Sequence, residues 1–534
     1  MLRFVNRQAE MMLIDDAFNA LQNYEDGGLL RTPIIDFFGV EGIGKTAVLG
    51  HIEEQCKKQQ IRYILIDTSR DVSHFSHEIV RQVTERYNIR LHPLDENEDL
   101  FQQSLHATKA LLEQGTAVMI LDSVDATNDE LLERIAATLR DVINEKKLFV
   151  VLASKRGLLF DFERSISRKL TSLQLHPLDR KSCEHYLDTV DPPLTPETRT
   201  YILDWTRGYP LAMEVMTAAI TEHKLDPALP EDQNALVDII VERVLDQKVF
   251  AKLAPAERSK YKEALTILSV PRRFNLVIMQ ELIEHFAPGL KRGSSLAYMK
   301  LPRSIKNDTD VLSWNMFRGG YAVDAPIRHI FLLKIRLEQT ELYANLHQFL
   351  AQLNKTLASE VTDSDRTRYL CEYLYHSAYV KNEQDFIQII GQTLLEITDI
   401  PFESLDSFEA YESSFEELLQ DDEFRKVLGE QTPTILSLMY KHLAEMNRRE
   451  ARKTLGEEHF YHLRDFFVYI VKDPKVTDMR SVWVDAIRDI ITEEPLGRTA
   501  QFVEELLNSG RLKEALGSHF DLFAELVPEI SLEG

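Results

Sequence analysis

The first 175 residues alternate short apolar runs with longer segments whose apolar residues recur every three or four positions. Nearly continuous apolar runs are typical of strands buried on both faces, and these fall at 33–38, 62–67, 117–121, 148–153 and 173–175. The intervening segments have the period of amphipathic helices, most clearly at 46–59, 72–87 and 97–114. Residues 1–175 are therefore predicted to form an α/β domain with a parallel sheet between helices.

Beyond residue 175 the apolar positions recur mainly at helical spacing. Residues 176–250 are predicted to be helical and to close with a helix over 235–249. Residues 251–337 contain helices, then a possible hairpin at Val311–Tyr321, then a helix from Pro326. This order predicts a winged-helix domain.

Residues 338–534 repeat one helical pattern after another, which predicts an all-α helical array built from antiparallel pairs. Segment 502–516 resembles part of a tetratricopeptide unit, but no period of about 34 residues recurs clearly. A tetratricopeptide-like array and an unrelated helical array both stay open. The clearest helical segments are 366–380, 385–397, 434–446 and 499–508.

A complete phosphate-binding loop follows the first predicted strand and precedes the first of these helices. Residues 39–46 satisfy the pattern G-x-x-x-x-G-K-[ST]. The glycines let successive N–H groups point at an anion, and the helix N-terminus favours negative charge. Lys45 supplies a charge for the β- and γ-phosphates. The pattern predicts a nucleotide site formed by Gly39, Val40, Glu41, Gly42, Ile43, Gly44, Lys45, Thr46 and Ala47.

Three further residues follow apolar strands and fit roles in phosphate chemistry. Asp122 ends the strand over 117–121 and, with the hydroxyl of Thr46, is predicted to ligate Mg²⁺ in the Walker B role. Asp125 could orient or deprotonate an attacking water, or it could cap a helix that begins near Asn128. Arg156 follows the next strand, where it could sense the γ-phosphate or belong to a solvated basic turn. We take Asp125 and Arg156 as the catalytic candidates.

Composition limits the class of protein. With 534 residues, 44% hydrophobic and 28% charged, the chain has the make-up of a soluble globular protein of several domains. It lacks an uncharged apolar run of about 18 residues, and its N-terminus lacks an apolar signal-peptide region, so we expect a cytoplasmic protein without membrane contact. Cys56, Cys183 and Cys371 have no metal-binding spacing and are expected to be reduced and buried.

The charge is unevenly distributed along the chain. The net charge of −24 argues against broad nucleic-acid binding. Residues 251–337 nevertheless hold 15 Lys+Arg and 7 Asp+Glu, a net of +8, so the remainder carries −32. A basic module between acidic ones indicates internal docking, a polyanion partner, or both.

Together these motifs resemble the signal-transduction ATPases with numerous domains, the STAND class of P-loop NTPases, which includes NACHT and NB-ARC proteins and is related to AAA+ ATPases. The resemblance spans roughly residues 3–337. Some positions depart from the family pattern: Asn6 and Glu41 stand where glycine is usual, and Ala126 stands where a glutamate is usual. The matching segments are Phe4–Glu10, Gly39–Thr46, Leu121–Asp125, Leu173–Leu178 and Gly208–Ala212.

The resemblance implies a nucleotide-dependent switch that uses ATP, ADP and Mg²⁺. It implies that Arg7 and Pro210 contact the nucleotide, with Pro210 on the adenine side, and that residues 176–250 form a helical lid. ADP would hold a closed state, and ATP would open it for self-assembly or partner recruitment. Many members carry a nucleotide-contacting His-Asp pair at the end of the winged helix; Val323 replaces the histidine here, and Arg328 is expected to dock the module.

Three functions compete at this point. The first is a slowly hydrolysing ATP switch that recruits a protein partner through its C-terminal helices or forms a homo-oligomer. The second is a DNA-binding ATPase of the origin-recognition AAA+ type, which the +8 module favours and the whole-chain charge opposes. The third is a non-enzymatic helical scaffold whose fold a bound nucleotide stabilises.

Overall fold

The computed structural model describes residues 7–24, 30–91, 99–124, 128–158, 160, 163–315, 320–361, 363–400, 405–429 and single residues between 432 and 446. The chain divides into two compact units. Unit 1 comprises Met1–Ser269, Met279–Ser313 and Ala322–Gln339, and unit 2 comprises Val270–Ile278, Trp314–Tyr321 and Thr340–Gly534.

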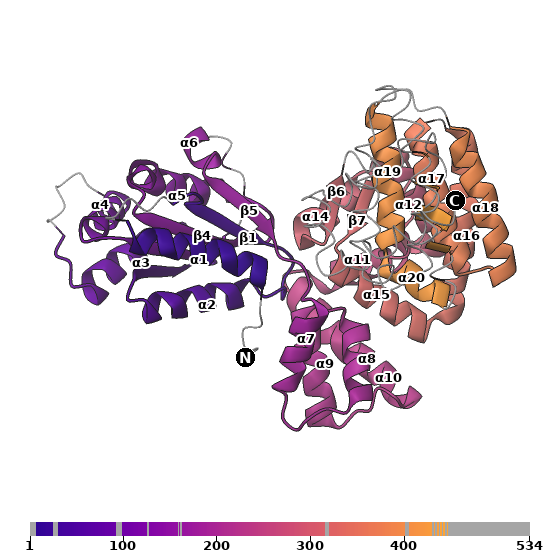
Figure 1. The fold of residues 1–534 in the computed structure, drawn as a ribbon, viewed down its shortest axis with the longest axis horizontal. Helices are drawn as coiled ribbons and strands as arrows, with labels where there is room; N and C mark the ends of the chain where they lie inside the picture. The colour runs from indigo at the N-terminus through magenta and orange to yellow at the C-terminus, as the bar shows by residue number, and fades with distance from the viewer. Residues whose placement is uncertain are drawn as a thin grey trace, which may run out of the picture. The chain divides into compact units, whose positions relative to one another are not determined.

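A five-stranded parallel sheet forms the core of unit 1 (Figure 1). The strand order is β2-β3-β4-β1-β5. In register, Ile34 pairs with Val150 on one side and Leu170 on the other. Because the strands are parallel, the carboxyl ends of β1, β3 and β4 share one edge of the sheet. The strands are β1 (Ile34–Phe38), β2 (Arg62–Asp67), β3 (Ala117–Val124), β4 (Leu148–Ser154) and β5 (Leu170–Gln174).

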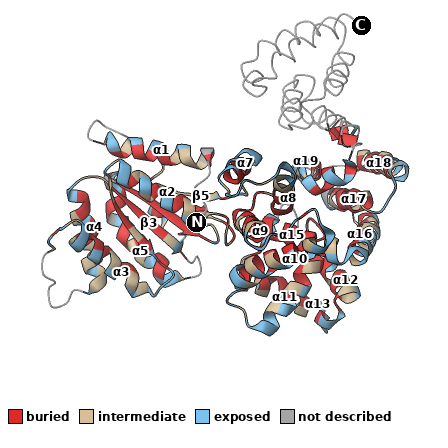
Figure 2. Cartoon of the chain, turned by 90° about the horizontal axis from the view of Figure 1, so that it is seen from below, coloured by how far each residue is buried: buried red, intermediate tan, exposed pale blue. Residues whose placement is uncertain are grey.

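Alternate strand residues face two different helical layers, as the strand period of two requires. Ile34, Met119 and Val150 point to one face and join a buried apolar cluster there. Figure 2 shows the buried sheet between the layers, with α3 and α5 below it in that view. The longest helices that contribute to this cluster are α3 (Val72–Arg81), α4 (Leu100–Glu113) and α5 (Asp129–Val142).

The opposite face of the sheet is covered by α1 (Gln8–Gln22) and α2 (Lys45–Lys58). Phe18 of α1 lies edge-on to Phe149 of β4, with ring centroids 6.3 Å apart. Val48 of α2 is fully buried. This layer therefore fixes α2, and with it the loop that precedes α2, against the sheet.

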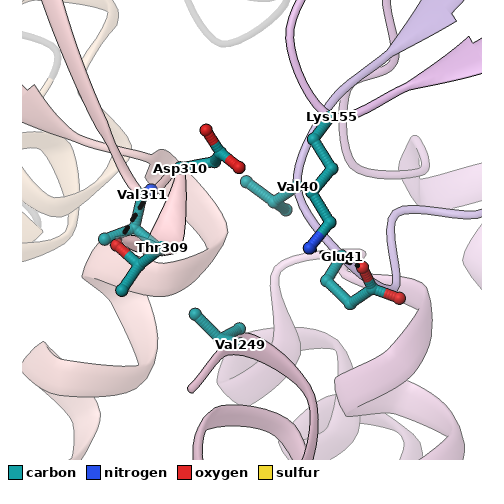
Figure 3. Close-up of a pocket in the computed structure, with 7 residues that line it drawn as sticks. All are labelled: Val40, Glu41, Lys155, Val249, Thr309, Asp310 and Val311. Atoms are coloured by element: carbon teal, nitrogen blue, oxygen red, sulfur yellow. Dashed lines mark hydrogen bonds and ion pairs between the residues drawn. The ribbon is translucent and has the colours of Figure 1, made fainter. Parts of the chain in front are cut away.

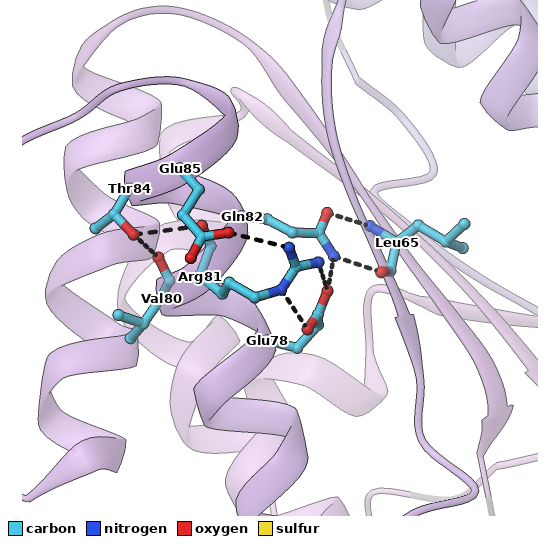
Figure 4. Close-up of polar contacts among 7 residues, drawn as sticks. All are labelled: Leu65, Glu78, Val80, Arg81, Gln82, Thr84 and Glu85. Atoms are coloured by element: carbon cyan, nitrogen blue, oxygen red, sulfur yellow. Dashed lines mark hydrogen bonds and ion pairs between the residues drawn. The ribbon is translucent and has the colours of Figure 1, made fainter.

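The exposed backbone of the edge strand β2 is satisfied by side chains (Figure 4). The amide of Gln82 accepts from the N–H of Leu65 at 3.1 Å and donates to its carbonyl at 2.6 Å. The hydroxyl of Tyr87 pairs in the same way with both backbone groups of Tyr63, at 2.7 Å each. Gln82 lies in a π-helical turn, Gln82–Arg86, that continues α3. These contacts close an edge that would otherwise be open to another strand.

The rest of unit 1 is mostly helical. Several helices begin at residues that favour a helix start. The side chains of Asp179 and Thr195 are N-caps that accept hydrogen bonds from backbone N–H groups, and Pro210 is the first residue of its helix. The elements are α6 (Arg164–Ser167), α7 (Arg180–Asp188), α8 (Pro196–Thr206), α9 (Pro210–His223), α10 (Pro230–Ile240) with a π-helical continuation (Val241–Val249), α11 (Pro255–Leu268), α12 (Leu276–Phe286), α13 (Ser295–Tyr298), α14 (Lys300–Thr309), β6 (Leu312–Asn315), β7 (Gly320–Val323) and α15 (Ala325–Glu338); parts of α12, β6 and β7 belong to unit 2.

Unit 2 is an array of helices in which α17 packs against α16, α18, α19 and α20. Two ion pairs hold the segment before α12 within this unit: Arg272 with Glu372 at 2.8 Å and Arg273 with Glu417 at 2.7 Å. The Arg272–Glu372 pair is buried, with each side chain 6% exposed. The helices are α16 (Thr340–Glu360), α17 (Asp363–Ala378), α18 (Glu383–Thr398), α19 (Leu405–Gln420) and α20 (Asp422–Leu428).

The predicted parallel sheet with flanking helices is confirmed, as is a helical C-terminal region. The last strand was placed too late, because β5 begins at Leu170 and not at residue 173. The helix predicted over 235–249 begins earlier, at Pro230. A two-stranded sheet, β6–β7, lies where a hairpin was predicted. Segments 499–508 and 502–516, and part of 434–446, lie outside the described residues.

Candidate functional site

The phosphate loop lies between β1 and α2 with its glycines in conformations that other residues rarely adopt. Gly42 has φ +78° and Gly44, the N-cap of α2, has φ +104°. A Cβ at Gly42 would lie 2.6 Å from side-chain atoms of Leu211, so the loop has no room for a side chain there. The sequence pattern therefore yields a backbone cradle at a helix N-terminus, which suits a phosphate group.

Lys45 begins α2 and turns back across this loop. Its ammonium donates to the carbonyls of Gly39 at 2.7 Å and Val40 at 2.9 Å. Burial lowers the pKa of Lys45, and the charge of Glu41 works in the opposite direction. The residue thus holds a positive charge at the loop in a partly desolvated position, where electrostatic attraction to a phosphate is strong.

Thr46 and Asp122 meet as the sequence predicted for a metal-binding pair. The Thr46 hydroxyl donates to Asp122 Oδ2 at 3.0 Å. Burial raises the pKa of Asp122, whereas the bond from Thr46 lowers it. Asp67 pairs with Asp122 in the β2–β3 register and adds a second carboxylate at this edge. Mg²⁺ prefers oxygen ligands, and the Thr46 hydroxyl and the Asp122 carboxylate could supply them beside the glycine-rich loop. The site therefore suits Mg²⁺ together with a nucleoside phosphate.

Arg7 reaches the phosphate loop from the segment before α1. Its guanidinium donates to the carbonyl of Ile43 at 2.7 Å and lies 3.3 Å from the carboxylate of Glu10. The residue is only 8% exposed, and burial lowers its pKa. The guanidinium also lies close to Gly44, since a Cβ at that glycine would be 3.7 Å from Arg7 Nη2. Arg7 therefore contacts the loop backbone directly.

The segment around Pro210 also contacts the phosphate loop. The Tyr209 hydroxyl donates to the carbonyl of Glu41, and the Leu211 N–H donates to the carbonyl of Gly42 at 3.3 Å. Pro210 is buried at the first turn of α9. Gly208 has φ +75°, and a Cβ there would lie 2.1 Å from the Leu178 carbonyl oxygen. Glycine at 208 is thus required to bring this segment to the loop.

The Arg156 side chain, which was predicted as a γ-phosphate sensor, is bound to other groups of the protein in this structure. It follows β4 at the same sheet edge, and its side chain bonds Asp310 and the carbonyl of Lys306 at the end of α14. Its neighbour Lys155 lies 3.5 Å from Glu41. Figure 3 shows the pocket between these groups. It is lined by Val40, Glu41, Lys155, Val249, Thr309, Asp310 and Val311.

A buried carboxylate in β1 joins the phosphate-loop strand to the segment after β4. Asp36 is 0% exposed and accepts from Ser154 Oγ at 2.8 and 3.0 Å and from the Leu158 N–H at 2.8 Å. Burial raises its pKa to about 6, against the effect of these hydrogen bonds and of Lys45. Sequence analysis missed this role; the only signal was one acid inside an apolar strand.

Asp324, between β7 and α15, is a second such acid, and it stands at the aspartate position of the His-Asp pair whose histidine Val323 replaces. Burial raises its pKa to about 7, and the charge of Lys45 lowers it. Its Oδ1 atom is buried without a hydrogen-bond partner among the described residues. Val323 before it is buried, and Arg328 after it donates to the Ser269 carbonyl at 2.8 Å, a contact within unit 1.

Several sequence-based candidates lie outside this geometry. Asp125, with Ala126, and residues 4–6 lie outside the described residues. Asn128 caps α5, accepting from the Leu131 N–H at 3.0 Å. All three cysteines are buried and unpaired with one another. Across the described ranges, no cluster of three or more His, Cys, Asp or Glu has metal-binding geometry, and no helix has the length and apolarity needed to cross a membrane.

Comparisons with known proteins agree with this core. The AAA domain family matches residues 31–160, which contain the phosphate loop, Asp122 and Arg156. No curated protein matches the chain.

Among solved structures, the chain is similar to Cdc6p from Pyrobaculum aerophilum, with 14% identity, TM-score 0.34, and 64% of this chain and 97% of that chain covered. It is similar to a STAND protein with a tetratricopeptide repeat sensor from Pyrococcus horikoshii, with 14% identity, TM-score 0.30, and 100% and 74% covered. A third is the ORC2 protein of Aeropyrum pernix, with 13% identity, TM-score 0.37, and 64% and 96% covered.

Proposed function

We propose that this protein is a nucleotide-dependent switch that binds ATP and ADP with Mg²⁺, hydrolyses ATP slowly, and changes its assembly or its partner binding with the nucleotide. The observation that carries the proposal is the contact of Thr46 with Asp122 at 3.0 Å beside the glycine cradle. A turn with a purely structural role would need the glycines, but it would not need the Thr46 hydroxyl and the half-buried Asp122 carboxylate to face each other beside the loop.

The residues around the cradle have distinct roles in this proposal. The loop N–H groups and Lys45 bind the β-phosphate side of the nucleotide. Arg7 fixes the loop through its bond to Ile43, at 2.7 Å, and Pro210 lies on the adenine side. Tyr209 ties that side to the loop through the Glu41 carbonyl. Nucleotide binding and the position of α9 would therefore be coupled.

Hydrolysis requires an activated water and stabilised phosphate charge. Thr46 and Asp122 would hold Mg²⁺, which when bound neutralises charge on the phosphate oxygens. Asp125 is proposed to orient the attacking water, since it follows Asp122 by three positions. Arg156 is proposed to stabilise the γ-phosphate once its side chain is free to do so.

The helical array is proposed to bind a protein partner or a second copy of the chain. The basic excess of residues 251–337 gives less support to DNA binding than the sequence suggested. Arg272 and Arg273 pair with Glu372 and Glu417 inside unit 2. Part of that positive charge is thus used within the protein, which is the internal docking role considered from sequence.

Replacement of Lys45 by Ala tests the proposed site. The purified wild type should retain or bind ADP stoichiometrically, and Lys45→Ala should bind at least about 100-fold more weakly, because a buried phosphate contact is lost. Calorimetric titration with ADP·Mg²⁺ gives both values. Lys58→Ala, at the exposed far end of the same helix, serves as the control. Equal ADP affinity in both variants would refute a nucleotide site at this loop.

A further inference from the structure

The two cations that follow β4 are both paired with acids of the same unit. Lys155 lies 3.5 Å from the Glu41 carboxylate in the phosphate loop. Arg156 Nε donates to the carboxylate of Asp310. Because β4 lies beside β1 in the sheet, both cations project at the edge where the phosphate loop begins. Lys155 and Arg156 therefore both have an acidic partner at that edge of the sheet.

The groups that accept hydrogen bonds from Arg156 lie at the C-terminal end of α14. Asp310 is the C-cap residue, in the left-handed region at φ +59°, and its N–H donates to the Lys306 carbonyl at 3.1 Å. The Arg156 guanidinium donates to that same carbonyl. The last carbonyls of a helix carry partial negative charge, so carboxylate and helix end attract the guanidinium together. The pair is partly buried, with Arg156 28% and Asp310 18% exposed.

A carboxylate and a phosphate are alternative partners for one guanidinium, since both accept its hydrogen bonds in the same planar geometry. The loop N–H groups and Lys45 suffice for a diphosphate. In the proposed function the third phosphate is the group that Arg156 stabilises, and in this structure Arg156 is bound to Asp310 instead. Asp310, the carboxylate that holds Arg156, also lines a pocket with Glu41 and Lys155 (Figure 3).

We infer that Asp310 is a specificity-determining residue that makes this conformation select a nucleoside diphosphate over a triphosphate, by holding Arg156 at the end of α14. The inference rests on the proposed function, because it concerns the same nucleotide site. It also gives a route for the switch: a γ-phosphate that takes Arg156 from Asp310 releases the end of α14 from the segment after β4.

The test is the ratio of two affinities in the full-length protein. ADP·Mg²⁺ and the Mg²⁺ complex of β,γ-imido-ATP are titrated calorimetrically into wild type and Asp310→Asn. The wild type is expected to prefer ADP. Asp310→Asn is expected to bind the triphosphate analogue roughly tenfold more tightly, the scale of one charged hydrogen bond, with ADP affinity changed less than about twofold.

Three further variants make the result specific. Asp310→Glu keeps the carboxylate and should keep the wild-type ratio, and Asp310→Ser is a second neutral variant in case the amide perturbs folding. Asp308→Asn removes the same charge from the same helix, at a residue that instead accepts from the Tyr261 hydroxyl at 2.5 Å. It should leave the ratio unchanged. Thermal unfolding establishes that each variant is folded.

The outcomes separate the inference from the proposed function. If wild type binds neither nucleotide, the proposed function fails and the inference fails with it. If both nucleotides bind in a Lys45-dependent way but Asp310→Asn and Asp310→Ser keep the wild-type ratio, the inference alone is overturned. A ratio that shifts equally in Asp308→Asn and Asp310→Asn would also overturn it, because general charge and not the Arg156 contact would be responsible.

Discussion

At the scale of single residues, three wholly or partly buried carboxylates interact with Lys45 of the phosphate loop. Asp36, Asp122 and Asp324 all have a raised pKa, because burial disfavours their charged forms. Lys45 lowers the pKa of each of them. The charge of Lys45 therefore favours the ionised forms of these acids, in addition to the phosphate contact that is proposed for it.

Asp36 gives a prediction about pH. Its pKa in the folded protein, about 6, lies above the ordinary value of 3.8, so the folded state binds the proton more tightly than the unfolded state. The wild type should gain stability relative to Asp36→Asn as the pH falls from about 6.5 to about 4, by roughly 3 kcal/mol, and show no relative change above that range.

Denaturant unfolding of both proteins at closely spaced pH values measures this difference. The comparison with Asp36→Asn cancels the contributions of all other titrating groups that the substitution leaves unchanged. Parallel stability curves across the range would mean that Asp36 does not titrate in the folded protein near pH 6.

The glycines provide a matched pair of substitutions. Gly42→Ala should destabilise the protein by about 1–3 kcal/mol, because φ is +78° and the new Cβ would lie 2.6 Å from Leu211. Gly50→Ala should stabilise it by about 0.5–1 kcal/mol, because Gly50 lies inside α2 with nothing within 4 Å of the new Cβ. Thermal or denaturant unfolding measures the change in stability for each variant and shows whether the two changes have opposite signs. Equal effects would contradict the loop geometry described above.

At the scale of elements, how far the sequence predicts the structure depends on how local the signal is. The strands and the phosphate loop follow from apolar runs and from adjacent glycines, so they could be placed directly. The contact of Arg156 with Asp310 joins residues 154 positions apart. The sequence around either residue gives no indication of its partner. Asp36 gave a weak signal, one acid in an apolar strand, whose meaning depends on Ser154 in a neighbouring strand.

The same scale gives a prediction for the buried ion pair in unit 2. Arg272, which precedes α12, pairs with Glu372 of α17 at 2.8 Å, and each side chain is 6% exposed. Arg272→Met should cost about 3–5 kcal/mol of unfolding free energy, because it leaves a buried carboxylate without its counterion. The double variant Arg272→Met/Glu372→Leu should recover much of that loss.

A double-mutant cycle with denaturant unfolding measures the coupling between the two residues. Arg273→Met, which removes the partner of the more exposed Glu417, is the matched control and should cost less. Additive single effects would show that the two side chains do not stabilise unit 2 through each other.

At the scale of the whole molecule, the proposal joins a nucleotide site in unit 1 to partner binding by the helices of unit 2. The phosphate loop is in contact with Arg7, with the start of α9 through Tyr209 and Leu211, and with Lys155. Under the proposed function, a change of nucleotide would therefore alter contacts made by segments that are far apart in the sequence. A slow switch needs this coupling more than it needs rapid hydrolysis.

The most direct test of the proposed switch is the mass of the protein in solution with ADP·Mg²⁺ and with ATP·Mg²⁺, measured by light scattering after chromatography, with the co-purified nucleotide extracted and identified. We predict bound ADP in the purified protein and a larger assembly in ATP only, both absent in Lys45→Ala. A nucleotide-free protein whose mass is the same under both conditions would contradict the switch.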